Sequence, residues 1–282
     1  MKVFITGADG ALGTAMQTVL RRENITFRAT DIKQLDIADY AATHAALSNY
    51  RPDIILHYAA MSNVDACEQN QGLAHRVNAL STMGLATVAR KIGAKMLYMS
   101  TNYVFDGTHE KPYSEYSSPH PLNQYGRTKL LGEQYVKDIC DRCVVVRTAW
   151  LFGDNSKNFI PSFIASTHKP TSIDVICDQF GSFTYTVDLA EALFLLIKAD
   201  AYGTFHIVNT GVGSWLDFAL KAKEIMHFKT DIQSVETEEL HLAALRPRYA
   251  PLESTNYEYL TSRTMPGWEH SLAAYIKSLT KK

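Results

Sequence analysis

Two side chains suited to proton transfer, Tyr125 and Lys129, stand four residues apart at the start of a helical pattern. That spacing places both on one face of a helix, one turn from each other. Upstream, an apolar run ends in Ser100 and Thr101, whose hydroxyls can meet the same face across a cleft. A tyrosine beside a lysine and a hydroxyl can give a proton to a carbonyl that receives hydride. We therefore predict Tyr125 and Lys129, together with a hydroxyl of this strand end, as a catalytic set, in which the charge of Lys129 lowers the pKa of Tyr125.

The spacing of this pair is weak evidence by itself, because about one such pair is expected by chance in a chain with fifteen tyrosines. The plain alternatives are a half-buried aromatic at Tyr125 and a solvated charge at Lys129. Three features of context favour chemistry. The pair opens a helix, a hydroxyl-bearing strand end precedes it, and a glycine turn lies at residues 7–13.

That glycine turn follows a predicted strand at residues 1–6, and a predicted helix at 12–22 follows the turn. Gly7, Gly10 and Gly13 recur at every third residue. Glycines let the backbone approach a pyrophosphate closely, and the N–H groups of a helix N-terminus favour phosphate. A plain turn is the alternative, but the place directly after an N-terminal strand favours nucleotide binding.

Asp31 closes the second predicted strand, residues 27–30, at about the distance from the glycines where an acid meets the adenosine ribose. An acid there favours NADH, whereas Arg28 and Lys33 are close enough to accommodate the 2′-phosphate of NADPH. The choice between NADPH and NADH is therefore left open. A role for Asp31 as a simple turn residue is also open.

Strands and helices alternate through the first half of the chain, which predicts an α/β fold with a Rossmann-type doubly wound parallel sheet and helices on both faces. The further predicted strands are 54–58, 95–99, 143–147 and 204–208, and the further helices are 39–50, 71–91, 128–139, 186–198 and 214–227. Asn78 in the helix 71–91 is expected either to bond a neighbouring strand's backbone or to be solvated. The polar segment 106–122 is expected to be a loop over the active face.

Two unequal parts are expected. Residues 1–152 form a dinucleotide-binding domain to which 181–208 returns, and residues 153–282 form mainly a smaller, interleaved substrate-binding cap. Ser214 is a predicted N-cap.

The charge of the chain is balanced, with a net charge of −1 and a pI near 6.8, which argues against nucleic-acid and membrane partners. No apolar run approaches the roughly 20 residues of a membrane span, so a soluble cytoplasmic protein is expected. Cys140 and Cys143 have the spacing of a metal or redox pair, but no second pair accompanies them. We predict no metal at these cysteines.

These motifs together resemble the extended short-chain dehydrogenases and, within them, the dTDP-4-dehydrorhamnose reductase family. The likeness covers nearly the whole chain, and its most specific parts are the Ser-Thr-x-Tyr-Val-Phe strand end and the Arg-Thr-Ala-Trp run at 147–150. It implies NAD(P)H-dependent reduction of the C4 ketone of dTDP-4-dehydro-L-rhamnose to dTDP-L-rhamnose, the last step in making that sugar nucleotide for cell-surface polysaccharide.

The resemblance also implies roles for individual residues, beside the catalytic Thr101, Tyr125 and Lys129. The cofactor-binding set, which again includes Tyr125 and Lys129, adds residues at the pyrophosphate, the adenosine and the nicotinamide: Gly7, Gly10, Ala11, Leu12, Gly13, Asp31, Asp36, Ile37, Ala60, Met61, Ser62 and Met99. The sugar nucleotide would meet Thr101, Asn102 and Trp150. Arg246 is a candidate for its diphosphate, because arginine binds phosphate bidentately. Core packing is an equal alternative for Trp150, and solvation for Arg246.

The chain departs from the family at two places. Asn102 stands where the reductases usually carry aspartate. Some members hold magnesium at a dimer contact through acidic side chains, and two of those positions are Ala15 and Val187 here. We therefore predict no magnesium site and expect a monomer or a weak homodimer.

Other functions stay open at this point. The Asn-Tyr-Val-Phe-Asp-Gly run at 102–107 also occurs in the regulatory β subunit of methionine adenosyltransferase, a relative that binds NADP and acts as a partner protein. A 4,6-dehydratase is disfavoured because no acid pair follows Thr101. A 4-epimerase is disfavoured because its C-terminal domain is usually longer.

Overall fold

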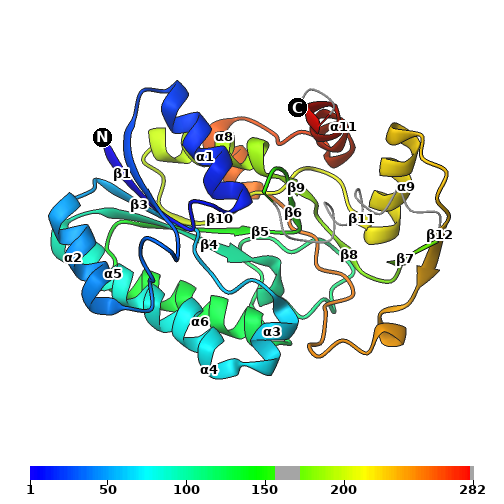
Figure 1. Cartoon of the computed structure of the whole chain (residues 1–282), viewed down its shortest axis with the longest axis horizontal. Coiled ribbons are helices and arrows are strands. Elements are labelled where there is room, and N and C mark those ends of the chain that lie inside the picture. The colour runs from blue at the N-terminus through cyan, green and yellow to red at the C-terminus, as the bar shows by residue number, and fades with distance from the viewer. Residues whose placement is uncertain (156–171, 280–282) are drawn as a thin grey trace.

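The computed structural model describes residues 1–155 and 172–279, and its centre is a six-stranded parallel sheet (Figure 1). Every pairing in this sheet is parallel. The strands, in spatial order, are β10 (Gly203–His206), β5 (Cys143–Thr148), β4 (Lys95–Thr101), β3 (Ile54–His57), β1 (Lys2–Thr6) and β2 (Thr26–Thr30). The predicted α/β sheet is therefore confirmed. Residues 156–171 and 280–282, which fall within the predicted cap, lie outside the described residues.

Helices cover both faces of the sheet (Figure 1). One face carries α1 (Ala11–Arg22) and α8 (Thr186–Lys198), and the other carries α2 (Tyr40–Tyr50), α5 (Ser81–Ile92) and α6 (Gln124–Ile139). Successive strand side chains point to opposite faces. Val3 and Ile5 therefore join the core under α1 and α8, whereas Phe4 joins the core under α2, α5 and α6. Burial on both faces explains why the strands are continuous apolar runs.

The helix predicted at 71–91 is confirmed as a continuous helical run, but it is not α-helical throughout. It consists of α4 (Gln71–Ala74), a π-helical stretch, His75–Leu80, and then α5. A separate short helix, α3 (Val64–Gln69), precedes it, and Asn63 and Asn70 cap the starts of α3 and α4 through their side chains. A π-helical turn often marks a functional site, and this one carries Asn78.

Two element boundaries differ from the prediction where they matter for the site. The helix predicted at 128–139 begins four residues earlier, at Gln124, because the Asn123 side chain accepts the Gly126 N–H at 2.9 Å and caps it. The strand predicted to end at Met99 continues to Thr101. Tyr125 and Lys129 therefore lie in the first turns of α6, and Thr101 is the last residue of β4.

A second, smaller core lies to one side of the sheet and is rich in aromatic residues (Figure 1). It is built from α9 (Trp215–Met226), α11 (Trp268–Leu279) and a parallel pair of strands, β7 (Ile173–Ile176) with β12 (Ile232–Val235). Short strand pairs join this region: β6 (Leu151–Phe152) with β9 (Thr184–Tyr185), and β8 (Phe180–Gly181) with β11 (Gly213–Ser214). The other short helices are η2 (Asn102–Val104), η3 (Thr237–Leu240) and α10 (Thr255–Thr261).

Several details of the second half bear on the predictions. The Ser214 N-cap is confirmed, and Asp217 completes a capping box with it. Both α8 and β10 lie with the large sheet, although the domain boundary at residue 152 stays a prediction. No helix among residues 1–155 and 172–279 is long and apolar enough to cross a membrane.

The segment 106–122 contains no helix or longer strand, but it is anchored. The Tyr113 hydroxyl donates to Asp106 at 2.8 Å, and the Tyr113 ring stacks on Phe105 with centroids 4.2 Å apart. Its backbone bonds both Pro251 and Glu253. This loop is therefore fastened to a segment near the C-terminus.

Candidate active site

The three predicted catalytic side chains meet where β4 ends and α6 begins. The Thr101 hydroxyl lies close enough to the Tyr125 phenol to influence its pKa, and it accepts the Tyr103 N–H at 3.2 Å. Lys129 lies one helical turn beyond Tyr125 and is only 3% exposed. The structure therefore brings the set together, while the role of each member stays a prediction.

Lys129 packs closely against Tyr98 of β4. Its ammonium group lies 4.2 Å from the ring centroid of Tyr98, and the Tyr98 hydroxyl donates to the Lys129 carbonyl at 3.2 Å. The contact is possible because residue 132 is glycine. A Cβ there would overlap the Tyr98 hydroxyl oxygen and lie 2.8 Å from Tyr98 Cζ. Burial lowers the pKa of Lys129 to about 7, and the charge of Glu133 opposes that shift.

The pKa of Tyr125 is the one electrostatic expectation that is wrong. Burial raises it above the ordinary tyrosine value, and the neighbouring Thr101 hydroxyl only partly opposes the shift. Burial also disfavours the charged form of Lys129. Its charge therefore does not bring the pKa of Tyr125 below the ordinary value in the protein chain alone. The raised pKa keeps the phenol protonated at neutral pH, which is the form that a proton donor needs.

The glycine turn forms a cradle that has no room for side chains. Gly7 has φ of +69°, and a Cβ there would lie 2.6 Å from the Ala59 nitrogen. A Cβ on Gly13 would lie 2.7 Å from the Ala8 Cα. Gly10 is the N-cap of α1 and makes no side-chain cap bond, so the first-turn N–H groups, those of Ala11 and Leu12 among them, point out of the helix start. These residues fit a dinucleotide pyrophosphate.

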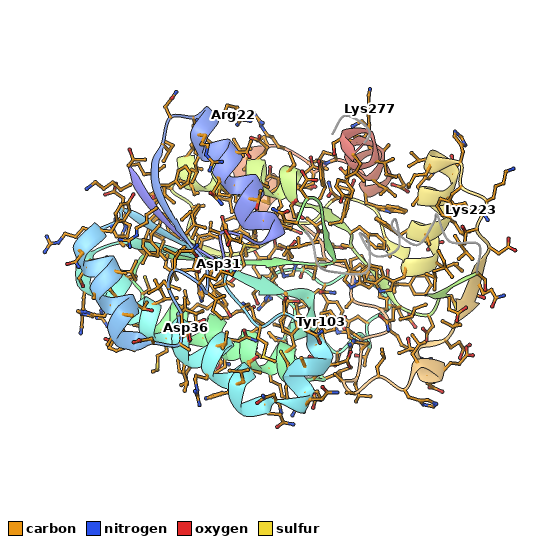
Figure 2. All side chains as sticks on the ribbon, viewed as in Figure 1. Arg22, Asp31, Asp36, Tyr103, Lys223 and Lys277 are labelled. Carbon is orange, nitrogen blue, oxygen red and sulfur yellow. The ribbon has the colours of Figure 1, made fainter. Side chains whose placement is uncertain are left out.

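Asp31 lies beside this cradle. Its carboxylate accepts the Asp9 N–H at 3.1 Å and the Ile32 N–H at 2.8 Å. Asp36 follows in the next loop, where it accepts the Ala38 N–H at 2.9 Å, and Figure 2 labels Asp31 near the middle of the molecule and Asp36 below it. The structure therefore ties Asp31 to the glycine turn through Asp9, whereas Ile37 is buried in the core under α2, α5 and α6.

The loop after β3, which contains Ala60, Met61 and Ser62, is held by a residue that the predicted site set lacks. Asn78 accepts the Met61 N–H at 2.8 Å and donates to the Met61 carbonyl at 3.1 Å. It also donates to the Thr128 hydroxyl at 3.1 Å, between Tyr125 and Lys129 on α6. The expected backbone bond is confirmed, with its partner just past the strand. An asparagine inside a predicted helix was the sequence signal for it.

The Asn102 side chain is buried and hydrogen-bonded within the protein. It is 2% exposed, its amide donates to the Ala250 carbonyl at 3.1 Å, and its oxygen lies 3.4 Å from the Thr101 hydroxyl. An aspartate at this position has no N–H to donate. The asparagine therefore ties the end of β4 to residues 244–252, which we call the closing segment.

The closing segment also carries Arg246, which is paired. Its guanidinium donates to both oxygens of Asp65, at 3.2 and 2.7 Å. Arg246 and Trp150 lie close enough to the Tyr103 hydroxyl to oppose the rise in its pKa that burial causes, and Figure 2 shows Tyr103 toward the smaller core. Three of these residues, Tyr103, Trp150 and Arg246, thus form one cluster, although Tyr103 was absent from the predicted set.

Trp150 is held in an uncommon backbone conformation, with φ of +39°. Its ring stacks on Trp215 with centroids 4.2 Å apart, and a Cβ at residue 181 would lie 2.8 Å from it. The packing alternative for Trp150 is therefore supported, and it coexists with the proximity of Trp150 to the Tyr103 hydroxyl. Met99, a predicted cofactor residue, is buried in the core of the sheet.

No group of three or more histidine, cysteine, aspartate or glutamate side chains within the described ranges is arranged to hold a metal ion. The four cysteines, Cys140 and Cys143 included, are free thiols. The absence of magnesium stays a prediction.

Comparison with known proteins points in one direction. The sequence matches the family model of the RmlD substrate binding domain over residues 1–281. A dTDP-4-keto-6-deoxy-D-glucose reductase of Streptomyces niveus is 36% identical over 88% of this chain and 87% of that protein. A dTDP-4-dehydrorhamnose reductase of Clostridium acetobutylicum superposes with a TM-score of 0.95 at 36% identity, over 99% of this chain and 100% of the other. The same enzyme from Bacillus anthracis, solved in complex with NADP, gives 0.95 at 37% identity, over 98% and 99%.

Proposed function

This chain belongs to the RmlD family, and on that premise we propose that it is an NAD(P)-dependent reductase of dTDP-4-dehydro-L-rhamnose that forms dTDP-L-rhamnose. The observation that carries the proposal is the meeting of Thr101, Tyr125 and Lys129 at the end of β4. The glycine cradle lies at the same carboxyl edge of the sheet, which is where open α/β sheets bind ligands.

The residues divide the proposed chemistry among themselves. The reduced nicotinamide, when bound, supplies the hydride that reaches C4 of the sugar. Tyr125 gives a proton to the oxygen that becomes the new hydroxyl, because its raised pKa keeps it protonated. The Thr101 hydroxyl, which lies close to the Tyr125 phenol, holds the same oxygen in line. Lys129 supplies positive charge beneath them in its protonated form.

We propose NADPH as the preferred reductant, with NADH as the weaker alternative. The Bacillus anthracis relative was solved with NADP. In this chain the Asp31 carboxylate is occupied by two backbone N–H groups, which reduces its demand for a ribose hydroxyl. Arg28 and Lys33, which flank Asp31 in the sequence, are both exposed and would supply positive charge for a 2′-phosphate.

The direct test follows the loss of reduced-nicotinamide absorbance with NADPH and then NADH, in the presence of dTDP-4-dehydro-L-rhamnose. Tyr125→Phe removes only the proton donor, and a positioned acid contributes about 10²- to 10⁴-fold. We expect turnover to fall by about that factor while the variant still binds NADPH with unchanged affinity. Near-normal turnover in Tyr125→Phe would remove the catalytic assignment.

A second substrate deserves an arm of the same assay. The Streptomyces niveus relative is named for the D-gluco sugar, dTDP-4-keto-6-deoxy-D-glucose, and it is as similar as the rhamnose enzymes. Turnover of that sugar in preference to the L-sugar would keep the reductase and change its substrate. If the protein binds NADPH but does not oxidise it with either sugar nucleotide, the result would instead favour the regulatory-subunit alternative.

A further inference from the structure

A carboxylate is buried directly behind the catalytic helix. Glu133 lies on α6 one turn beyond Lys129 and is 1% exposed. The Ser100 hydroxyl donates to its Oε1 at 2.5 Å. Arg147 donates to both of its oxygens, at 2.8 and 2.7 Å, and is itself 3% exposed. Every strong partner of this carboxylate therefore comes from the sheet.

The two strands that hold Glu133 are neighbours at the active edge. Ser100 is paired with Arg147 in the register of β4 and β5, and Ser100 is the residue directly before Thr101. Tyr125, Lys129 and Glu133 follow each other at intervals of four along one face of α6. One carboxylate thus fastens the helix that carries two catalytic side chains to the strand end that carries the third.

Stability alone does not explain this arrangement. A buried ion pair costs so much desolvation that well-packed apolar residues of similar volume often serve as well or better. An apolar trio at 100, 133 and 147 would fill the same space, but it would lack directional bonds. Hydrogen bonds of 2.5 to 2.8 Å fix the distance and the rotation of α6 against β4.

We propose that Glu133 is a positioning residue for the reaction, and that its bond to Ser100 sets the distance between Thr101 and the Tyr125–Lys129 pair. The proposal rests on the proposed function, because it assigns a role within that chemistry. The structure gives Glu133 no direct contact with Tyr125 or Thr101, so it acts through Ser100 and through α6.

The charge of Glu133 has a second, separable effect. The groups that act on the ammonium of Lys129 are Glu133 on its own helix, Cys67 on α3, His57 on β3 and the Tyr98 ring on β4. His57 is neutral, since burial and Lys129 lower its pKa to about 3. Glu133 raises the pKa of Lys129 against the effect of burial. Loss of its charge, with Arg147 left uncompensated, moves the pKa of Lys129 down.

Three variants separate these effects. Ser100→Ala removes the tether and leaves the Glu133–Arg147 ion pair in place. Glu133→Gln keeps the shape and removes the charge. Lys137→Ala is the matched control, because the Lys137 ammonium lies 3.7 Å from the same carboxylate but is 42% exposed and contacts no part of the active edge.

The experiment measures kcat, KM for the sugar nucleotide and NADPH affinity in wild type and each variant across pH. Wild-type turnover tests the proposed function by itself. Given that turnover, we expect Ser100→Ala to lose about tenfold in kcat with both affinities nearly unchanged, because a small displacement of catalytic groups affects the reaction more than binding. Lys137→Ala should match wild type.

The pH profile supplies the readout that a structural role alone would not move. Glu133→Gln should shift the basic limb of kcat/KM to lower pH, whereas Ser100→Ala should lower kcat and leave the limb in place. The positioning role is refuted if folded Ser100→Ala turns over like wild type. If Glu133→Gln does not fold, Ser100→Ala alone decides the outcome.

Discussion

Substitution of Gly132 by alanine tests how closely α6 must approach the sheet. Intrinsic helix propensity favours alanine by about 1 kcal/mol at an interior helix position. The structure opposes it, because a Cβ at residue 132 would overlap the Tyr98 hydroxyl oxygen and lie 2.9 Å from the Asn78 carbonyl oxygen. Tyr98 is fully buried, so its ring cannot move away from a new Cβ without displacing its neighbours.

The balance of these effects predicts a loss of stability. Overpacking a tight core costs about 1–3 kcal/mol, and loss of the Tyr98–Lys129 hydrogen bond adds about 1 kcal/mol. After the gain in propensity is subtracted, we expect the free energy of unfolding to fall by about 1–3 kcal/mol. For a protein of this size that is a drop in Tm of about 2–5 °C.

Thermal unfolding and NADPH turnover should be measured on the same preparations. Turnover should also fall, because the displaced Tyr98 ring no longer supports Lys129. Gly72→Ala is the matched control, since Gly72 lies in the helix α4 and a Cβ there meets nothing within 4 Å. The reasoning about close approach fails if Gly132→Ala is as stable as wild type or more stable.

Two further predictions concern charge. Because the pKa of Lys129 in the free protein is about 7 and its charged form is the active one, kcat/KM should fall as pH rises through about 7; a profile that is flat from pH 6 to 9 would contradict this. Arg246→Ala should raise the KM for the sugar nucleotide and spare NADPH affinity, because Asp65 is partly exposed and tolerates the loss of its partner. Arg248→Ala, at a side chain that is 66% exposed, is the control, and equal KM values for the two variants would end the assignment of Arg246.

The features that the sequence predicts well are those that depend on residues close together in the chain. The apolar strands, the glycine turn after β1 and the helix α8 depend on neighbouring residues, and α8 was predicted with its observed bounds. The Tyr125–Lys129 pair is also local, since one helical turn joins the two residues. The Ser100–Thr101 pair follows from topology, because parallel strands end at one edge, whereas the choice of Thr101 within that pair depends on the family resemblance.

What the sequence could not predict depends on contacts between distant residues. The hydrogen bond from Asn102 to Ala250 joins residues 148 positions apart, and no local sequence pattern predicts it. Asn78 bonds Met61 from within a π-helical turn, and the 3.6-residue period gives no sign of such a turn. The pKa of Tyr125 moved opposite to expectation because burial, a property of the whole fold, outweighed its nearest charge.

The closing segment has a consequence for the order in which the protein is made. The five sheet strands that come first in sequence end at Thr148, so most of the sheet and its helices can form while synthesis continues. The buried amide of Asn102 nevertheless has no partner until Ala250 is available, and Asp65 waits for Arg246. A nascent chain that has already formed its nucleotide cradle therefore still lacks the contacts that complete the proposed substrate-binding side. The ability to reduce a substrate is then among the last properties to form.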